Sequence, residues 1–173
     1  FRKLNEYNLV SMSLLDQEDY DDNYSTALKI YFEDFSKKYT VFEELITKLD
    51  LFTKIINERF TFKTIRISRE KGCEVIDENK SQKTLALEQL SSGEKQEIVL
   101  FYELIFETKS NLMLLIDEPE ISLHITWQKK FLDDLLKVSK ISHIKAIVAT
   151  HSPQIISNHW DIQIDLGELY GKE

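Results

Sequence analysis

The chain has 173 residues, 42% of them hydrophobic and 30% charged, which is enough for a domain with a hydrophobic core and unlike a disordered segment. Its formal net charge of −8 argues against broad, non-specific binding to DNA or RNA, because contacts to phosphates need lysine and arginine. No apolar run approaches the roughly 20 residues of a membrane-spanning helix, and we expect no signal peptide. The single cysteine, Cys73, leaves no internal disulfide and fits a reducing compartment, so we expect a cytoplasmic protein. Because the chain begins at Phe1, we also expect it to be a piece of a longer protein.

The first third of the chain has a helical pattern. Residues 1 to about 23 are irregular, whereas apolar residues from Ser25 to about Phe60 recur mostly at three- and four-residue steps. No proline interrupts this stretch, so it predicts either two helices or one long helix with a break near Tyr39. We interpret residues 1–60 as a helical segment or insert without chemistry of its own.

Three short strands are predicted next. Residues from Phe62 to about Ile67 alternate in polarity, a turn follows at Lys71-Gly72, and the pattern returns at residues 74–76. A third strand is predicted from Thr84 to Leu87, which completes a small antiparallel meander. The one short basic cluster favours a solvated face over a nucleic-acid site, and it consists of Lys63, Arg66, Arg69 and Lys71.

The stretch from Leu90 to Gln96 reads LSSGEKQ and predicts the start of a helix. The first N–H groups of a helix lack internal partners and carry partial positive charge, so this end could bind an anion. Gly93 would let a phosphate approach the backbone closely. An ordinary capping box formed by Ser91 and Glu94 explains the same residues equally well.

A helix and then a strand–helix–strand unit follow. The helix from Glu94 to about Lys109 is apolar around most of its circumference, which predicts burial on several sides. The apolar run from Leu112 to Ile116 predicts a strand at the centre of a parallel sheet. An amphipathic helix over residues 127–140 then leads to a second apolar strand over residues 144–149.

This order predicts two parallel neighbouring strands with a right-handed crossover between them. Asp161 to Leu166 is predicted to be a final edge strand. The fold class is therefore α/β, with a parallel sheet core, a helical N-terminal segment and a small antiparallel meander.

Polar side chains follow both predicted parallel strands. Asp117 and Glu118 end the first strand, and His151 follows the second. Ligands of parallel sheets bind at the carboxyl ends of the strands, where two adjacent carboxylates suit a magnesium–phosphate site. Taken singly, the carboxylates could be solvated acids at the end of a strand, and a lone histidine is better interpreted as a hydrogen-bonded residue at the sheet rim. The three residues together, in this order and on these elements, favour the site.

Four motifs in order resemble the C-terminal half of an ABC-type ATPase, and they are LSSGEKQ, LMLLIDEPE, SLH and ATHSPQII. More narrowly they are similar to the soluble SMC/RecF/OLD-like branch of AAA-type ATP-binding proteins. The motifs cover about residues 90–158. The resemblance implies a partial P-loop NTPase fold in which residues 61–173 are the C-terminal part of the ATPase domain.

The resemblance also implies roles for individual residues. The signature motif, which contacts the γ-phosphate of ATP held by the opposite subunit, would consist of Ser91, Ser92 and Gly93 with Glu94. Asp117 would be the Walker B aspartate that holds Mg²⁺ through water, and Glu118 the catalytic carboxylate. His151 would be the switch histidine on the γ-phosphate. The D-loop at the dimer interface would run from Ser122 to His124.

Two departures from the ABC pattern are visible. Transporter signatures usually have glycine where Ser92 stands and glutamine where Glu94 stands, which points to the soluble branch. The D-loop of many relatives ends in an acid, so His124 leaves its own role open.

The P-loop is missing from the printed sequence. The string from Gly167 to Glu173 is one residue too short for this motif, and it ends in glutamate where a hydroxyl should bind the metal. We therefore expect the N-terminal lobe with its Walker A motif to lie outside this chain.

These motifs predict an ATP-binding and ATP-hydrolysing domain. The complete protein is expected to bind ATP and Mg²⁺ between two head-to-tail copies, and the fragment alone is expected to be inactive. DNA or a nuclease is the expected partner, in DNA maintenance or anti-phage defence, with no membrane association. The alternative is a non-hydrolysing, ATP-switched effector module that controls a partner nuclease; a transporter subunit and a non-catalytic remnant are less consistent with these motifs.

Overall fold

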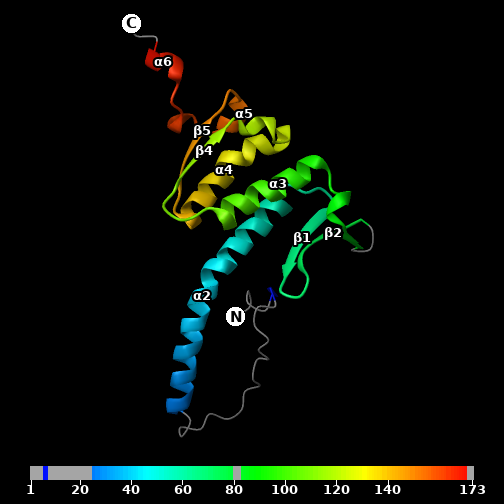
Figure 1. Ribbon diagram of the computed structural model, residues 1–173, viewed down its shortest axis with the longest axis vertical. Helices are drawn as coiled ribbons and strands as arrows, with labels where there is room; N and C mark the ends of the chain where they lie inside the picture. Colours follow the sequence, from blue (N-terminus) through cyan, green and yellow to red (C-terminus); the bar gives the residue numbers. More distant parts are fainter. Residues whose placement is uncertain (1–5, 8–24, 80–82, 171–173) are drawn as a thin grey trace. The chain divides into compact units, whose positions relative to one another are not determined.

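The computed structural model describes residues 6–7, 25–79 and 83–170 of the chain (Figure 1). It divides into two compact units, Phe1–Gln89 and Leu90–Glu173, which are described separately below. Most of the segment predicted to be irregular, residues 1–23, lies outside the described residues. The division of the chain between residues 60 and 61 into an insert and an ATPase part stays a prediction.

Helix α2 (Ser25–Asn57) dominates the first unit as one uninterrupted helix of 33 residues (Figure 1). The predicted break near Tyr39 is therefore wrong. The helix contains no glycine or proline, and three threonine hydroxyls along it donate back to the carbonyl four residues earlier, at Thr40, Thr47 and Thr53. It therefore lacks the two residue types that most often break a helix.

The C-terminal end of α2 is tied to strand β1 (Lys63–Ser68). The Asn57 side chain donates to the Ile65 carbonyl at 3.2 Å and accepts from the Ile65 N–H at 2.7 Å. Apolar burial follows the same end of the helix, since Ile55 and Ile56 are almost fully buried whereas Ile30 and Phe32 are more than 60% exposed. Among the α2 side chains that the structure describes, the buried ones therefore lie in the C-terminal half of the helix.

The predicted meander is confirmed. Strand β1 pairs antiparallel with β2 (Gly72–Asp77), which pairs in turn with β3 (Lys83–Leu85). The register places buried Ile65 opposite buried Val75. Leu87, predicted as the end of the third strand, instead begins a 3₁₀ turn, η2 (Leu87–Gln89). The basic cluster is mostly solvated as predicted, because three of its four residues are exposed.

The second unit begins with α3 (Ser92–Tyr102), which continues into a π-helical turn, η3 (Glu103–Glu107). The remaining elements, in chain order, are β4 (Met113–Asp117), η4 (Pro119–Ile121), α4 (Ile125–Ser142), β5 (Lys145–Ala149), α5 (Pro153–Ile156), η5 (Trp160–Ile162) and α6 (Leu166–Tyr170). Among the helices that the structure describes, none has the length and hydropathy of a membrane-spanning segment.

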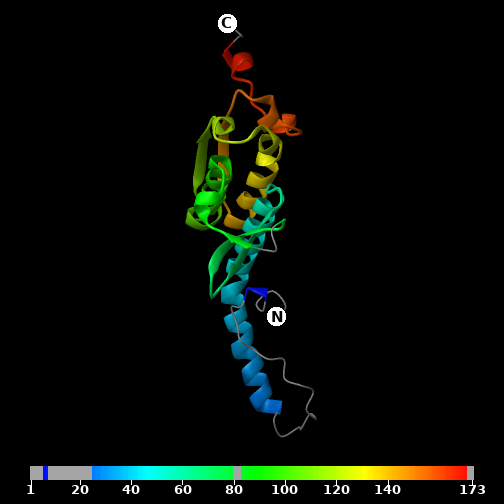
Figure 2. The ribbon, with the colours of Figure 1, turned by 90° about the vertical axis from the view of Figure 1, so that its right-hand side faces the viewer.

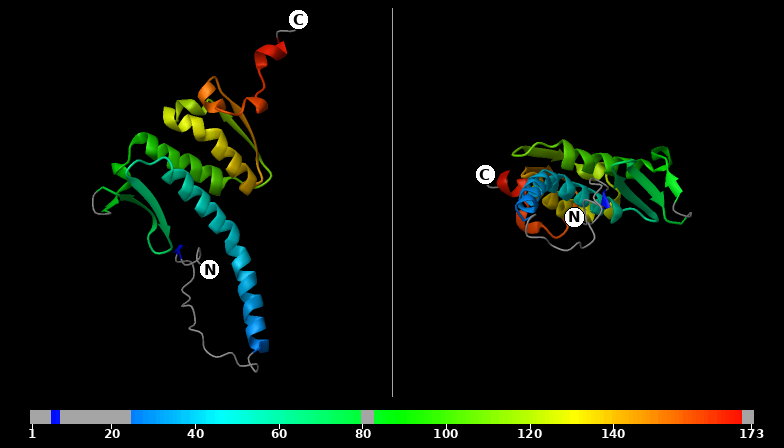
Figure 3. Two further views of the ribbon diagram at one scale, coloured as in Figure 1. Left: turned by 180° about the vertical axis from the view of Figure 1, so that it is seen from behind. Right: turned by 90° about the horizontal axis from the view of Figure 1, so that it is seen from below.

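Strands β4 and β5 are parallel neighbours, as predicted, with Leu115 opposite Ile147 and Asp117 opposite Ala149. Helices α3 and α4 lie on one side of this strand pair (Figures 2 and 3). On that side α4 buries its apolar stripe, which consists of Phe131, Leu135 and Val138.

The other side of the strand pair is exposed. Leu115 is 73% exposed and Met113 is 60% exposed, so the predicted burial of β4 on both faces is wrong for the described residues. The predicted burial of α3 on several sides is also wrong, because Val99 is 53% exposed. Both predictions assumed packing partners that the described part of the chain does not provide.

The edge strand predicted at residues 161–166 is not formed. Part of this segment is the 3₁₀ turn η5, and α6 begins at Leu166. The Asp165 carboxylate accepts a hydrogen bond from the Gly167 N–H at 2.8 Å, which caps the start of that helix. Alternating polarity alone does not make a strand without a neighbour to pair with.

Neighbouring leucines on α4 provide a matched test of this core. Leu135 is 3% exposed and Leu136 is 41% exposed. We expect Leu135→Ala to lower the free energy of unfolding by about 2–5 kcal/mol, because it leaves a cavity. Leu136→Ala should cost less than about 1 kcal/mol. Urea unfolding followed by helical circular dichroism measures both, and equal losses would contradict the described packing.

Candidate functional site

The carboxyl ends of β4 and β5 lie side by side. Glu118 directly follows β4, and its N–H donates to the Ala149 carbonyl at the end of β5 at 2.8 Å. The backbone of Glu118 is left-handed, with a φ of 43°. A non-glycine residue pays a free-energy cost for this conformation, and such residues cluster at functional sites. The strand pairing therefore continues one residue past the strand and then turns the Glu118 side chain away from the strand direction.

The structure brings Glu118 and His151 together at this edge. Their side-chain atoms Oε1 and Nε2 are 3.8 Å apart, which is longer than a hydrogen bond. The His151 side chain is 92% exposed and that of Glu118 is 42% exposed, so a ligand can reach both. Asp117, the last residue of β4, is also exposed. All three residues predicted for the strand ends therefore share one accessible edge.

Glu120 was not predicted as a site residue, yet it joins the two strand ends. Both of its carboxylate oxygens accept from the Thr150 hydroxyl at 2.7 Å, and one also accepts from the His151 N–H at 3.0 Å. Partial desolvation acts to raise the pKa of Glu120. The hydrogen bonds that it receives outweigh this effect and hold the pKa below its ordinary value.

Gln128, on the first turn of α4, was also missed. Its side-chain amide donates to the backbone carbonyls of Glu120 and Leu123 at 3.1 and 3.2 Å, and it accepts from the Ser152 hydroxyl at 3.2 Å. No local pattern in the sequence marks these contacts, because the partners of Glu120 lie 30 and 31 residues away. Only the strand pairing brings them within reach.

The start of α3 is a complete capping box. The Ser91 hydroxyl accepts from the Glu94 N–H at 3.2 Å, and the Glu94 carboxylate accepts from the Ser91 N–H at 2.8 Å. This confirms the capping interpretation, and anion binding stays a prediction. A side chain at Gly93 would meet the Trp127 ring at 3.5 Å, an ordinary contact distance. In the described part of the chain, no hydrogen bond or ion pair links residues 91–93 with the acids and histidine at the strand ends.

The predicted D-loop residues have clear local roles. His124 is the N-cap of α4, where its Nδ1 accepts from the Thr126 N–H at 3.4 Å and lies 2.9 Å from the Thr126 hydroxyl. Ser122 closes the preceding turn through its N–H, which donates to the Pro119 carbonyl at 3.2 Å. Both side chains are exposed. A histidine can therefore stand at residue 124 because it caps the helix there.

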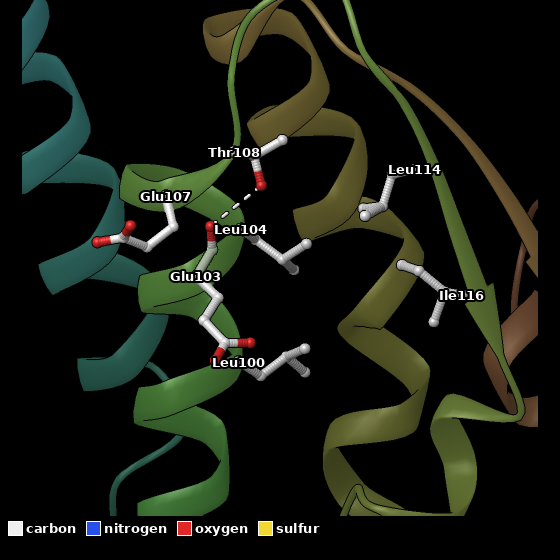
Figure 4. Close-up of a pocket in the computed structure, with 7 residues that line it drawn as sticks. All are labelled: Leu100, Glu103, Leu104, Glu107, Thr108, Leu114 and Ile116. Carbon is white, nitrogen blue, oxygen red and sulfur yellow. Dashed lines mark hydrogen bonds between the residues drawn. The ribbon is translucent and has the colours of Figure 1, made fainter.

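A separate groove of about 420 Å³ lies between α3, η3 and β4 (Figure 4). Leu114 and Ile116 of β4 point toward it, and the facing helix contributes Leu100, Glu103, Leu104, Glu107 and Thr108. The Thr108 hydroxyl donates to the Glu103 carbonyl at 3.0 Å. This groove does not include the residues at the strand ends.

The strand-end residues fit a magnesium–phosphate site. Among the described residues, no group of three or more histidines, cysteines and acids is arranged to hold a metal ion. Mg²⁺ seldom needs such a cage, since it usually keeps several waters and takes one or two carboxylates plus phosphate oxygens. The exposed Asp117 carboxylate meets this requirement.

Comparison with known families identifies the class of protein. Residues 7–157 match the family described as "AAA domain, putative AbiEii toxin, Type IV TA system", and the chain belongs to this family. It is therefore part of an AAA-type ATPase family, in which nucleotide binding is expected, typically with Mg²⁺. No curated protein matches the sequence.

Solved structures of SMC proteins are similar to the chain. An SMC head bound to the C-terminal winged-helix domain of ScpA is 22% identical, with a TM-score of 0.46 over 63% of this chain and 35% of that one. A structure from a study of ATP-driven dimerisation and DNA-stimulated activation of SMC ATPases is 19% identical, with a TM-score of 0.43 over 70% and 77% of the two chains. A Pyrococcus furiosus Smc head with an extended coiled coil is 17% identical, with a TM-score of 0.40 over 79% and 38%. The chain thus spans only 35% of the first of these relatives.

The capping box at α3 allows a test by paired substitutions. We expect Ser91→Ala to lower the free energy of unfolding by about 1 kcal/mol, because the Glu94 N–H loses its acceptor. Ser92→Ala, one residue into the helix, should change it by about 0.5 kcal/mol or less. Thermal or urea unfolding measures the difference. A larger effect at Ser92 would show that the helix is capped in another way.

Proposed function

We propose that this chain supplies the signature, Walker B and switch-histidine parts of an ATPase that binds two ATP molecules between two head-to-tail copies and hydrolyses them. The observation that carries the proposal is the parallel pairing of β4 and β5, which leaves Glu118 and His151 3.8 Å apart at one exposed edge. Family membership supports ATP as the nucleotide. The lobe with the Walker A motif would lie in the rest of the protein.

The proposed chemistry assigns one task to each residue at the strand ends. Asp117 would hold Mg²⁺ through its water shell, and this ion would supply neutralising charge to the phosphates. Glu118 would orient and deprotonate the attacking water. His151 would donate a hydrogen bond to the γ-phosphate. The exposure of the Glu118 and His151 side chains supports these tasks, because both can reach a bound ligand.

The signature motif would complete the site of the other copy. Residues 91–93 lie at the start of α3, where the helix dipole favours an anion. Glu94 would hold this turn through the capping box, and Ser122 and His124 would lie at the dimer interface.

The proposed setting is cytoplasmic, in DNA maintenance or anti-phage defence. The family description, which names a type IV toxin–antitoxin system, supports a defence role. In the second candidate function ATP acts as a switch without turnover, and the protein controls a partner nuclease. In this candidate the exposed Ile30 and Phe32 on α2 would form part of the docking surface for the nuclease.

Substitution of Glu118 tests the proposal in the complete protein. We expect Glu118→Gln to lower ATP turnover by about 100-fold or more, since the water loses its base, while ATP-driven dimerisation remains. Steady-state hydrolysis and light scattering measure the two properties. Asp161→Asn, on the exposed turn η5, is the matched control and should leave both unchanged. Unchanged turnover in Glu118→Gln would contradict the assignment, and absence of turnover in the wild type would favour the switch.

A further inference from the structure

The Glu120 carboxylate makes contacts that the proposed reaction does not use. It lies on η4, two residues after Glu118, and turns back toward the end of β5. There it receives the Thr150 hydroxyl at 2.7 Å and the His151 N–H at 3.0 Å. Two donors on consecutive residues of one loop thus converge on a single side chain of the other loop.

The His151 backbone is fixed, but its imidazole is not packed. With 92% of the side chain exposed, little surrounds the ring to hold it in place. The direction of the imidazole therefore depends on where the backbone of residue 151 is held. The Glu120 carboxylate provides that hold, and a charged acceptor makes a stronger hydrogen bond than a neutral one.

Further bonds fix the acceptor itself. The Thr150 hydroxyl that donates to Glu120 also accepts from the Ser152 N–H at 3.0 Å, which closes a tight turn around His151. The Gln128 side chain holds the Glu120 carbonyl at 3.1 Å and the Ser152 hydroxyl at 3.2 Å. The loop that carries Glu118 and the loop that carries His151 are therefore joined from both sides of the histidine.

We propose that Glu120 is a positioning residue, which sets the placement of His151 relative to Glu118 through the Thr150 hydroxyl and the His151 N–H. This inference rests on the proposed function, because it assigns to Glu120 and Thr150 the task of directing His151 toward the γ-phosphate. Glu120 itself touches neither nucleotide nor water in this account. Its carboxylate is hydrogen-bonded to the loop after β5, whereas the carboxylate of Glu118 is accessible.

The test compares variants of the complete protein. We expect Glu120→Ala to lower kcat for ATP by about 10- to 100-fold, as for a misplaced group, with KM changed by no more than about twofold. Thr150→Val should lower kcat in the same direction, and Thr150→Ser, which keeps the hydroxyl, should restore it. Asp161→Asn again serves as the control. Thermal unfolding checks that each variant is folded.

Two further readouts separate positioning from other roles. Exchange of the His151 amide with deuterium, followed by NMR, should be at least tenfold faster in Glu120→Ala than in the wild type, since the amide loses its acceptor. In a His151→Ala background, Glu120→Ala should add little to the loss of kcat, because both substitutions remove the same effect.

The outcomes are distinct. Unchanged exchange of the His151 amide, or a full additional loss of kcat in the His151→Ala background, would overturn the positioning role. Normal kcat in the His151→Ala variant would overturn the proposed function of the histidine, and with it the task assigned to Glu120. Faster exchange in Glu120→Ala would in that case still show that the Glu120 carboxylate holds the His151 backbone. If Thr150→Ser, which keeps the hydroxyl, loses as much kcat as Thr150→Val, the result would also contradict the inference.

Discussion

The parallel pairing of β4 with β5 is the constraint on which the rest of the candidate site depends. Two parallel strands bring their carboxyl ends to one edge, so residues more than 30 positions apart in the chain become neighbours. The pairing continues past the strand through the bond from the Glu118 N–H to the Ala149 carbonyl. A shift of register by one residue would move Glu118 away from His151 and separate Glu120 from Thr150. The burial of α4 against one side of the strand pair stabilises this register.

Backbone geometry gives the three acids at the end of β4 and in the turn that follows different surroundings. Asp117 ends the strand and is exposed. Glu118 adopts a left-handed conformation that sends its side chain toward His151, and the buried Pro119 begins a 3₁₀ turn. That turn points Glu120 back to the loop after β5, where hydrogen bonds lower its pKa. Three carboxylates within four residues are thereby suited to different tasks: one accessible for a hydrated metal ion, one facing a histidine, and one joining two loops.

Much of this arrangement could be predicted from the sequence, because periodicity and motif order carry strong signals. The meander, the amphipathic α4, the parallel pair and the capping box at Ser91 all follow from patterns within short windows. The failures have a common physical cause, since each depends on what lies next to a segment in space. Leu115 looks like a central strand residue but is exposed, and residues 161–166 alternate like a strand but have no strand to pair with. Glu120 and Gln128 were missed for the same reason, because their importance comes from partners far away in the chain.

The central claim is that one copy of the protein holds the strand-end acids and histidine, and that a second copy supplies the signature motif to them. Mixing two inactive variants of the complete protein tests it most directly. Ser92→Arg should block the signature, Glu118→Gln should remove the base, and each should be nearly inactive alone. If the site is shared, half of the dimers in an equal mixture are mixed and each contains one intact site, so turnover should recover to roughly a quarter of the wild-type value. If the mixture shows no more turnover than the two variants measured separately, each copy acts alone and the account is wrong.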